Sequence, residues 1–320
     1  MERGSESLAF REVGLGYAKA FIFGEYAVLE GHTAVVLALD LQAKASLSQS
    51  DVSYASAFER ELFERLKTKF PTYMRLSFNT NAFYAEDKTK WGIGASSATC
   101  VAALDLLQKT LGRPTELYRM GSCTPALLQA IYLHRELQGH TGSGADVVAA
   151  ALGGLNQLKN MMQVPAITRL PLQLPAMLLL SAKKAASTQE FLQGVAKIST
   201  NSDYLAITKA LGEIADNASH AIRTNDLQSV MHCAKTVDPL LHDLGRILKK
   251  PIVCDEHMAL KRRAERFGIV SKVSGAGGGD LSLLFAENAQ ILDHFYENEA
   301  KYLAFKRICS RSAPIRHNLG

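Results

Sequence analysis

Two short glycine-rich segments carry the residues best suited to hold a phosphate group. In the first, Gly92, Gly94, Ser96 and Ser97 lead directly into an apolar segment with helical periodicity, residues 99–111. Glycine lets the backbone turn tightly and approach a ligand, and serine supplies a capping hydroxyl group. The free N–H groups at a helix start attract anions such as phosphate. An ordinary capped helix after a glycine turn explains the pattern about equally well.

The second segment, residues 274–280, has four glycines within the five positions 275–279. Each glycine costs conformational entropy when it is ordered, so such a run does not serve helix or sheet stability. Close approach of the backbone to a neighbour or a ligand explains it better. Neither segment matches the Walker A pattern, and neither has the full spacing of a dinucleotide-binding motif.

Three charged residues are candidates for the chemistry of such a site. Asp146 follows the Gly-Ser-Gly turn of residues 142–144 and opens a helical pattern that carries no other charge. The helix dipole alone favours an acid there, so a structural and a functional role weigh about equally. Lys19 and Glu25 bracket a short apolar segment and could both face a pocket at its ends, although such pairs usually lie on the surface.

A further pair of lysines, Lys183 and Lys184, stands just before Ser187 and Thr188. Ser187 and Glu190 have the spacing of a capping box, which predicts a helix start beside the two lysines and hence a second anion site. A capped helix with exposed lysines is the simpler alternative.

Hydrophobic periodicity and turn residues predict the elements that position these residues. The expected strands are residues 20–23, 33–39, 74–78, 178–180, 269–273 and 281–286. The expected helices are residues 58–70, 99–111, 125–138, 202–219, 226–235 and 256–267, with further helix starts near Asp146 and Ser187.

Length and composition fit a globular protein of two domains. The 320 residues are 47% hydrophobic and 21% charged. The proline-richer stretch 165–175 predicts a boundary that divides the chain into residues 1–165 and 166–320. No apolar run reaches membrane-spanning length, the N-terminus lacks the apolar core of a secretory signal, and the five cysteines are scattered. We therefore expect a cytoplasmic protein with free thiols and no membrane partner.

The formal net charge of +5 suits an anionic small molecule better than nucleic acid, because the basic residues do not form a stripe. Residues 134–136, His-Arg-Glu, superficially resemble the catalytic loop of protein kinases. The aspartate and the Asp-Phe-Gly triplet of that family are missing, so the sequence excludes it.

Taken together, the segments resemble the motifs of the GHMP small-molecule kinases, which include galactokinase, homoserine kinase and mevalonate kinase. Three motifs occur in the family's order, in residues 19–28, 92–98 and 274–279. The resemblance is closest to phosphomevalonate kinases, whose Lys-Tyr-Gly-Leu-Gly and Gly-Ser-Gly-Phe-Asp-Val segments are similar to residues 90–94 and 142–147.

The resemblance implies a two-domain α+β fold, with an N-terminal domain like domain 2 of ribosomal protein S5 and a C-terminal ferredoxin-like domain. ATP and substrate would meet in the cleft between the domains. The implied reaction is ATP-dependent phosphorylation of phosphomevalonate to diphosphomevalonate, in the mevalonate route to isoprenoids. ATP and Mg²⁺ are the implied cofactors, and a phosphorylated small molecule is the implied partner.

The resemblance also implies residue roles. Asp146 would take or orient the acceptor's proton, and Lys19 beside it would neutralise the transferring phosphoryl group. The nucleotide phosphates would meet Gly92, Ile93, Gly94, Ala95, Ser96 and Ser97, supported by Gly277 and Gly278. Ser96 or Ser97 would meet Mg²⁺. The acceptor would meet Lys183, Lys184, Ser187, Thr188, Gly275 and Asp280.

The chain departs from the family pattern at several of these places. Ala95 stands where the family usually has the first serine of a pair, and residues 17–18 are Tyr-Ala instead of Pro-Gly. Ala145 replaces an aromatic residue beside the acid, and Leu281 replaces a cysteine or similar small residue. The last two changes could reshape the acceptor pocket.

Three alternatives stay open. The first is mevalonate kinase, or another GHMP kinase with a different acceptor. A non-catalytic ligand sensor of the same fold would predict loss of Asp146 or Lys19, and both are present. The related ATP-dependent decarboxylase has a phosphate loop similar to residues 95–98, but Lys19 argues against it. The sequence leaves a homodimer open as well.

Overall fold

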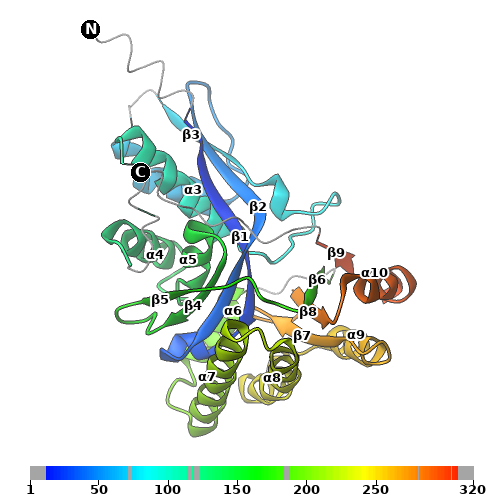
Figure 1. Ribbon diagram of the computed structural model, residues 1–320. Helices are drawn as coiled ribbons and strands as arrows, with labels where there is room; N and C mark the ends of the chain where they lie inside the picture. The colour runs from blue at the N-terminus through cyan, green and yellow to red at the C-terminus, as the bar shows by residue number, and fades with distance from the viewer. Residues whose placement is uncertain are drawn as a thin grey trace.

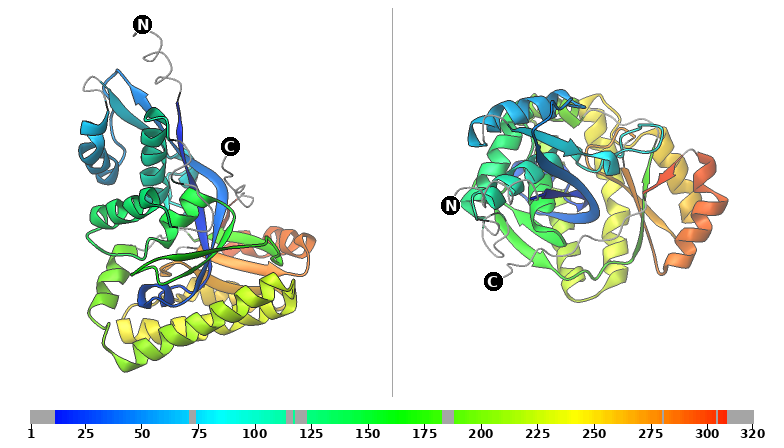
Figure 2. Two further views of the ribbon diagram at one scale, coloured as in Figure 1. Left: turned by 60° about the vertical axis from the view of Figure 1, so that its left-hand side comes forward. Right: turned by 90° about the horizontal axis from the view of Figure 1, so that it is seen from above.

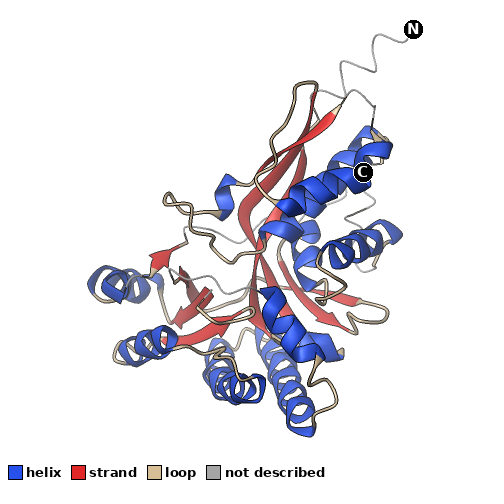
Figure 3. Cartoon of the chain, turned by 180° about the vertical axis from the view of Figure 1, so that it is seen from behind, coloured by secondary structure: helices blue, strands red, loops and turns tan. Residues whose placement is uncertain are grey.

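The computed structural model describes residues 12–70, 74–113, 117, 123–182, 188–279, 281–303 and 305–308. These residues form two antiparallel sheets with helices packed around them (Figure 1). Figure 3, seen from behind, shows the strands running through the middle of the molecule and the helices outside them.

The first sheet is built on the long strand β2 (Ala34–Ser48), which pairs along one edge with β1 (Gly14–Phe23). Along its other edge, the first half of β2 pairs with β4 (Leu155–Lys159) and the second half with β3 (Arg75–Asn79). The strand β5 (Ala166–Leu170) extends the sheet beyond β4. The predicted boundary near residue 165 stays a prediction, and the first sheet continues to Leu170.

The helix α3 (Ala95–Thr110) lies directly on β1 and β2. Glycine permits this contact, because a Cβ atom on Gly16 would lie 2.0 Å from the carbonyl oxygen of Ala98. A Cβ atom on Gly14 would lie 1.9 Å from the carbonyl oxygen of Ala102, one turn further along α3. The backbones of strand and helix therefore touch without intervening side chains.

Three further helices complete this layer. The helix α5 (Ala145–Leu152) packs against both α3 and β1, and α4 (Pro125–Leu137) packs against α3 and α5. The helix α2 (Ala57–Leu66) contacts α3, α4 and β3. Because α3 and α5 both rest on β1, their N-terminal ends are placed by the same strand.

The second sheet has the strand order β7 (Val270–Ser274), β8 (Leu281–Ala286), β6 (Ala176–Ser181), β9 (Lys306–Arg307). Successive side chains of a strand point to opposite faces, and both faces of this sheet are buried. Leu178, Leu180 and Leu284 belong to one core cluster, whereas Leu179 and Leu283 belong to the other. This double burial explains the nearly uninterrupted apolar sequence of β6 and β8.

Helices cover the two faces of the second sheet. The helices α9 (Asp255–Glu265) and α10 (Ala289–Asn298) contribute Leu260 and Phe295 to the smaller cluster. On the other face, α8 (Leu227–Leu248) packs against β7 and against α6 (Thr188–Ala196).

The helix α7 (Ser202–Arg223) joins the two halves, because it packs against α8 and also against β1, β2 and β5 (Figure 2). Its Asp216 accepts a hydrogen bond from the Thr33 hydroxyl at 2.8 Å and forms a 2.9 Å ion pair with Lys159. Among the described helices, none combines the length and the hydrophobicity that a membrane span requires.

The predicted elements agree with the structure in type, but the strands β4, β5 and β9 and the helix α10 were not predicted, and other elements differ in extent. The strand β2 continues past the predicted residue 39 to Ser48, because Ala43, Ala45 and Leu47 keep alternating into the core. The helix α8 continues past the predicted residue 235 to Leu248, with Pro239 inside it. The buried face that includes Leu241 and Leu244 holds the helix together beyond the proline.

Candidate active site

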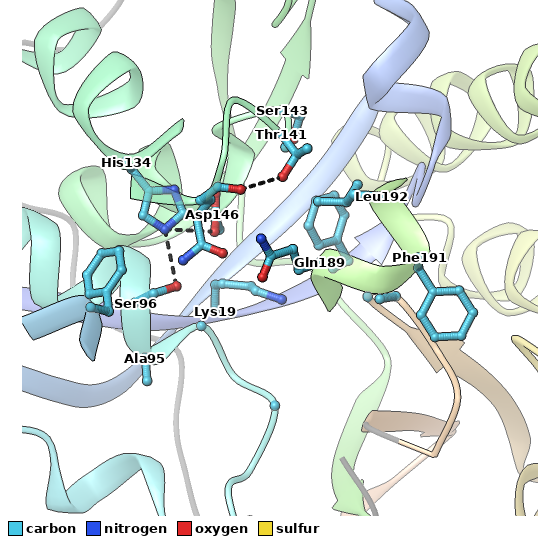
Figure 4. A pocket seen from close by; sticks show the side chains of 18 of the residues that line it. Lys19, Ala95, Ser96, His134, Thr141, Ser143, Asp146, Gln189, Phe191 and Leu192 are labelled. Carbon is cyan, nitrogen blue, oxygen red and sulfur yellow. Dashed lines mark hydrogen bonds and ion pairs between the residues drawn. The ribbon is translucent and has the colours of Figure 1, made fainter. Parts of the chain in front are cut away.

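A cavity of about 370 Å³ lies at the N-terminal ends of α3 and α5. Residues from both halves of the chain line it, and Figure 4 shows their side chains at close range. The first half contributes Lys19, Glu25, Gly94, Ser96, His134 and Asp146. The second half contributes Gln189, Phe191, Leu192, Gly275 and Ala276.

The loop before α3 presents its backbone to this cavity. Gly94 is the N-cap residue of α3, has a left-handed φ of 84°, and caps the helix without a side-chain hydrogen bond. A Cβ atom on Gly94 would lie 3.0 Å from Cγ of Lys19, so a side chain would crowd the lysine. The first N–H groups of a helix have no partner within the helix. The start of α3 therefore fits an anion such as a nucleotide phosphate.

The two serines after Gly94 occupy different environments. Ser97 is fully buried, and its hydroxyl donates a 2.9 Å hydrogen bond to the carbonyl oxygen of Gly94. Ser96 lines the cavity. Of the two predicted metal-binding serines, Ser96 is thus the one that faces the ligand space. The predicted nucleotide residue Ile93 is buried, and its carbonyl oxygen accepts a 2.9 Å hydrogen bond from the Lys19 N–H group.

The two predicted catalytic residues, Lys19 and Asp146, both line the cavity (Figure 4). Asp146 is the second residue of α5, its side chain is one quarter exposed (25%), and its Oδ1 accepts a 3.0 Å hydrogen bond from the Val147 N–H group. The Nζ atom of Lys19 lies 5.2 Å from the ring centroid of Phe21. The structure therefore brings a carboxylate and an ammonium group to the cavity at the start of α3.

His134 is a site residue that the sequence analysis missed. Its Nε2 atom lies 3.1 Å from the Ser96 Oγ atom and 4.0 Å from Oδ2 of Asp146. Burial lowers the pKa of the imidazole, against the opposing effect of the Asp146 carboxylate. The ring is therefore neutral at neutral pH. Helical spacing could have indicated it, because His134 continues the buried face of α4 formed by Leu127 and Ile131.

Arg135 fixes the turn that carries Asp146. Its guanidinium group donates hydrogen bonds to the carbonyl oxygens of Gly142 at 3.0 Å, Ser143 at 2.5 Å and Met161 at 2.9 Å. Burial lowers the pKa of this guanidinium group. Because three carbonyl groups share one guanidinium group, the position of the α5 start is set by Arg135.

One part of the second glycine segment lines the cavity, and the other part packs in the core. Gly275 and Ala276 line the cavity, and the carbonyl oxygen of Ala276 accepts a 2.6 Å hydrogen bond from the Tyr26 hydroxyl. Gly277 packs on Ile252 instead, since a Cβ atom there would lie 2.5 Å from the Ile252 carbonyl oxygen. The N–H group of Gly278 donates to that same oxygen at 2.8 Å. The structure thus places two predicted nucleotide-binding residues, Gly277 and Gly278, against Ile252.

Glu25 lines the cavity but its charge is already paired. Its Oε1 lies 2.6 Å from the Nζ atom of Lys272, and both side chains are buried. Lys272 also donates a 2.6 Å hydrogen bond to the carbonyl oxygen of Val273. This ion pair ties the end of β1 to β7 in the second sheet.

Most predicted acceptor residues, Lys183, Lys184, Ser187, Asp280 and the Thr188 side chain, lie outside the described residues. In the described part, α6 brings Gln189, Phe191 and Leu192 to the cavity. A Cβ atom on Gly142 would lie 3.8 Å from Cδ1 of Leu192, so α6 closely faces the Gly-Ser-Gly turn. These α6 residues were not predicted as site residues.

No group of three or more His, Cys, Asp or Glu residues in the described part of the chain could hold a metal ion alone. A Mg²⁺ ion that accompanies a nucleotide takes most of its ligands from phosphates and water. The predicted Mg²⁺ contact at Ser96 stays a prediction.

Comparison with known proteins finds a family model that matches part of the chain. Residues 54–154 match the family model for the GHMP kinases N terminal domain. No curated protein sequence matches the chain significantly.

Solved structures match over nearly the whole chain. A Lin0012 protein from Listeria innocua has 19% sequence identity and a TM-score of 0.81, and the match covers 96% of this chain and 99% of that one. Streptococcus pneumoniae phosphomevalonate kinase in complex with phosphomevalonate and AMPPNP has 16% identity and a TM-score of 0.72, with 94% and 99% covered. L. major mevalonate kinase in complex with R-mevalonate has 19% identity and a TM-score of 0.64, with 92% and 94% covered. The expected α+β fold is confirmed, with two antiparallel sheets and similar structures that cover nearly the whole chain.

Proposed function

We propose that this chain, which carries the N-terminal domain of the GHMP kinases and has their fold over nearly its whole length, transfers the γ-phosphoryl group of ATP to a small molecule. One observation carries the proposal: Lys19, Ser96 and Asp146 line one cavity at the N-terminus of α3. Phosphoryl transfer needs alignment and charge neutralisation more than covalent assistance, and these groups supply both.

Each group has a distinct task in this proposal. The N–H groups at the start of α3 hold the nucleotide phosphates, and the absence of a side chain on Gly94 leaves the backbone accessible. Lys19 neutralises the charge of the moving phosphoryl group. Asp146 orients the attacking oxygen of the acceptor, which is a phosphate oxygen in phosphomevalonate and a hydroxyl oxygen in mevalonate, and takes any proton that this oxygen carries. Mg²⁺, when bound with the nucleotide, bridges phosphate oxygens and neutralises their charge.

Phosphomevalonate is the proposed acceptor and diphosphomevalonate the proposed product. Two findings support it: the Gly-Ser-Gly-Ala-Asp-Val segment of residues 142–147, and the likeness to the S. pneumoniae structure that contains phosphomevalonate. The acceptor's phosphate would meet Lys183 and Lys184 near the start of α6. In this proposal the enzyme works in the cytoplasm, in the route to isoprenoids.

Mevalonate itself is a second candidate acceptor. Besides Lys19, the described cavity wall includes the neutral side chains of Gln138, Thr141, Gln189 and Leu192. Neutral amides and hydroxyls suit the hydroxyl groups of an unphosphorylated alcohol, so this wall favours mevalonate kinase as the alternative.

An acceptor panel tests the proposal. ADP release is measured with ATP, Mg²⁺ and either phosphomevalonate or mevalonate, and ³¹P NMR identifies the product. We expect a diphosphate product from phosphomevalonate and none with Asp146→Ala. Preference for mevalonate would overturn the acceptor, and release of carbon dioxide would indicate a decarboxylase. Nucleotide binding without turnover on either acceptor would favour a ligand sensor.

A further inference from the structure

We propose that His134 and Ser96 together bind the divalent cation that accompanies the nucleotide, and that this nitrogen–oxygen pair makes the site prefer Mn²⁺ to Mg²⁺. The inference rests on the proposed function, because the cation arrives with the nucleotide phosphates. It assigns a ligand role to a histidine for which the family resemblance gave none.

The spacing of the two atoms is that of neighbouring metal ligands. The Nε2 atom of His134 lies 3.1 Å from the Oγ atom of Ser96 (Figure 4). Two adjacent ligands of an octahedral cation, with bonds of about 2.1 Å, stand about 3.0 Å apart. The same separation is that of the hydrogen bond between the two side chains, which a cation bound by both atoms would replace.

The other carboxylates of the cavity wall are committed elsewhere. Glu25 is paired with Lys272 at 2.6 Å, and Glu59 accepts a 2.9 Å hydrogen bond from the Ala55 N–H group. Asp146 lies 4.0 Å from Nε2 of His134, close enough to offset the charge of a cation there. Among the described wall residues, this leaves His134 and Ser96 as the direct protein ligands and Asp146 available for the acceptor.

The imidazole is prepared for this role by its surroundings. The imidazole is buried between α4 and the start of α3, where its Nε2 atom lies 3.1 Å from the Ser96 Oγ atom. The edge of the ring packs on Phe58, with the two ring centroids 5.8 Å apart. The histidine is therefore held in place before any ligand binds.

The donor atoms determine the preferred ion. Mg²⁺ strongly favours oxygen ligands, whereas imidazole binds first-row transition ions better. Mn²⁺ keeps the preference for phosphate and carboxylate oxygen and also accepts an imidazole nitrogen. One nitrogen in an otherwise oxygen-rich shell shifts the balance toward Mn²⁺.

Electron spin echo spectroscopy tests the nitrogen ligand directly. The full chain, grown with ¹⁵N-labelled histidine, is mixed with Mn²⁺ and the β,γ-methylene analogue of ATP. We expect ¹⁵N coupling from a directly bound imidazole in the parent protein and in the exposed control His220→Gln, and its loss in His134→Gln. Binding of the Mn²⁺-nucleotide without ¹⁵N coupling overturns the proposal and leaves the proposed function standing.

Calorimetric titration with the same nucleotide analogue tests the ion preference. We expect affinity about tenfold higher with Mn²⁺ than with Mg²⁺ in the parent protein, because one ligand is nitrogen. His134→Glu, which offers oxygen instead, should reduce this ratio to about threefold or less. An equal ratio in both proteins contradicts the ion preference. Failure of the nucleotide to bind with either ion overturns the proposed function and this inference together.

Discussion

Two buried lysines, one in each sheet, have different surroundings. Lys272 of β7 is 1% exposed, and Glu25 neutralises it at 2.6 Å. Lys19 of β1 is 9% exposed and lines the cavity beside Gly94. Burial alone therefore does not distinguish a lysine held in the core from one that lines a cavity. The two lysines differ in their surroundings: Lys272 is enclosed with Glu25, whereas Lys19 borders the cavity.

The largest expected effect is on stability, from Lys272→Met. This change leaves the buried Glu25 carboxylate without its partner. We expect the free energy of unfolding to fall by about 3–5 kcal/mol, because an uncompensated buried charge is costly. Chemical denaturation measures it. The double variant Lys272→Met/Glu25→Leu removes both charges and should recover most of the loss, and equal stability of the two variants would contradict the structural role.

Lys19→Met should lower turnover rather than stability. We expect turnover to fall by roughly two or more orders of magnitude, the scale of a lost charge-stabilising group, with the fold intact. Asp146→Ala should give a loss of similar size. Steady-state kinetics and circular dichroism check both variants. Near-full turnover in either would show that the roles are wrongly assigned.

Gly94→Ala probes the position of Lys19 without removing it. The left-handed backbone should cost about 1–2 kcal/mol of stability, and the new methyl group would press on Cγ of Lys19. We expect turnover to fall about tenfold, because small displacements of an aligned group are costly.

Gly112→Ala is the matched control for Gly94→Ala. Gly112 also has a positive φ, of 70°, but a Cβ atom there would meet no other atom within 4 Å. The stability of the Gly112→Ala variant should fall by a similar amount, and its turnover should be unchanged. Equal turnover in the two variants would show that Lys19 is not held by this contact.

The smallest expected effect comes from an exposed lysine. Lys250 forms a 2.7 Å ion pair with Glu190, and both side chains are largely in solvent. Lys250→Met should change the free energy of unfolding by less than about 1 kcal/mol, because such pairs are screened by water. Thermal denaturation at two salt concentrations checks it. A loss as large as that of Lys272→Met would remove the contrast between paired lysines inside and outside the core.

The sequence predicted local features well because their causes are local. A glycine before an apolar helical segment marks the start of α3, and a Gly-Ser-Gly turn marks the start of α5. Capping by Thr124 marks the start of α4. The family motifs then named Lys19 and Asp146, which the structure brings to one cavity.

Long-range pairing could not be predicted in the same way. Glu25 and Lys272 are 247 residues apart in the chain, so the sequence alone did not indicate that Lys272 is the partner of Glu25. Gly277 and Gly278 look like ligand-binding glycines until Ile252 is known to pack against them. His134 was not predicted because its contact is with the Ser96 hydroxyl, which belongs to a different helix.

Gly14 and Gly16 contact α3 without intervening side chains. This contact separates the position of the groups proposed for phosphoryl transfer from the shape of the wall proposed to meet the acceptor. Lys19, Ser96 and Asp146 are carried by β1, α3 and α5, which pack as one unit. The facing wall comes from α6, on the other side of the cavity. Randomising Gln189, Phe191 and Leu192 should therefore change the acceptor specificity, while the groups carried by β1, α3 and α5 keep their relative positions.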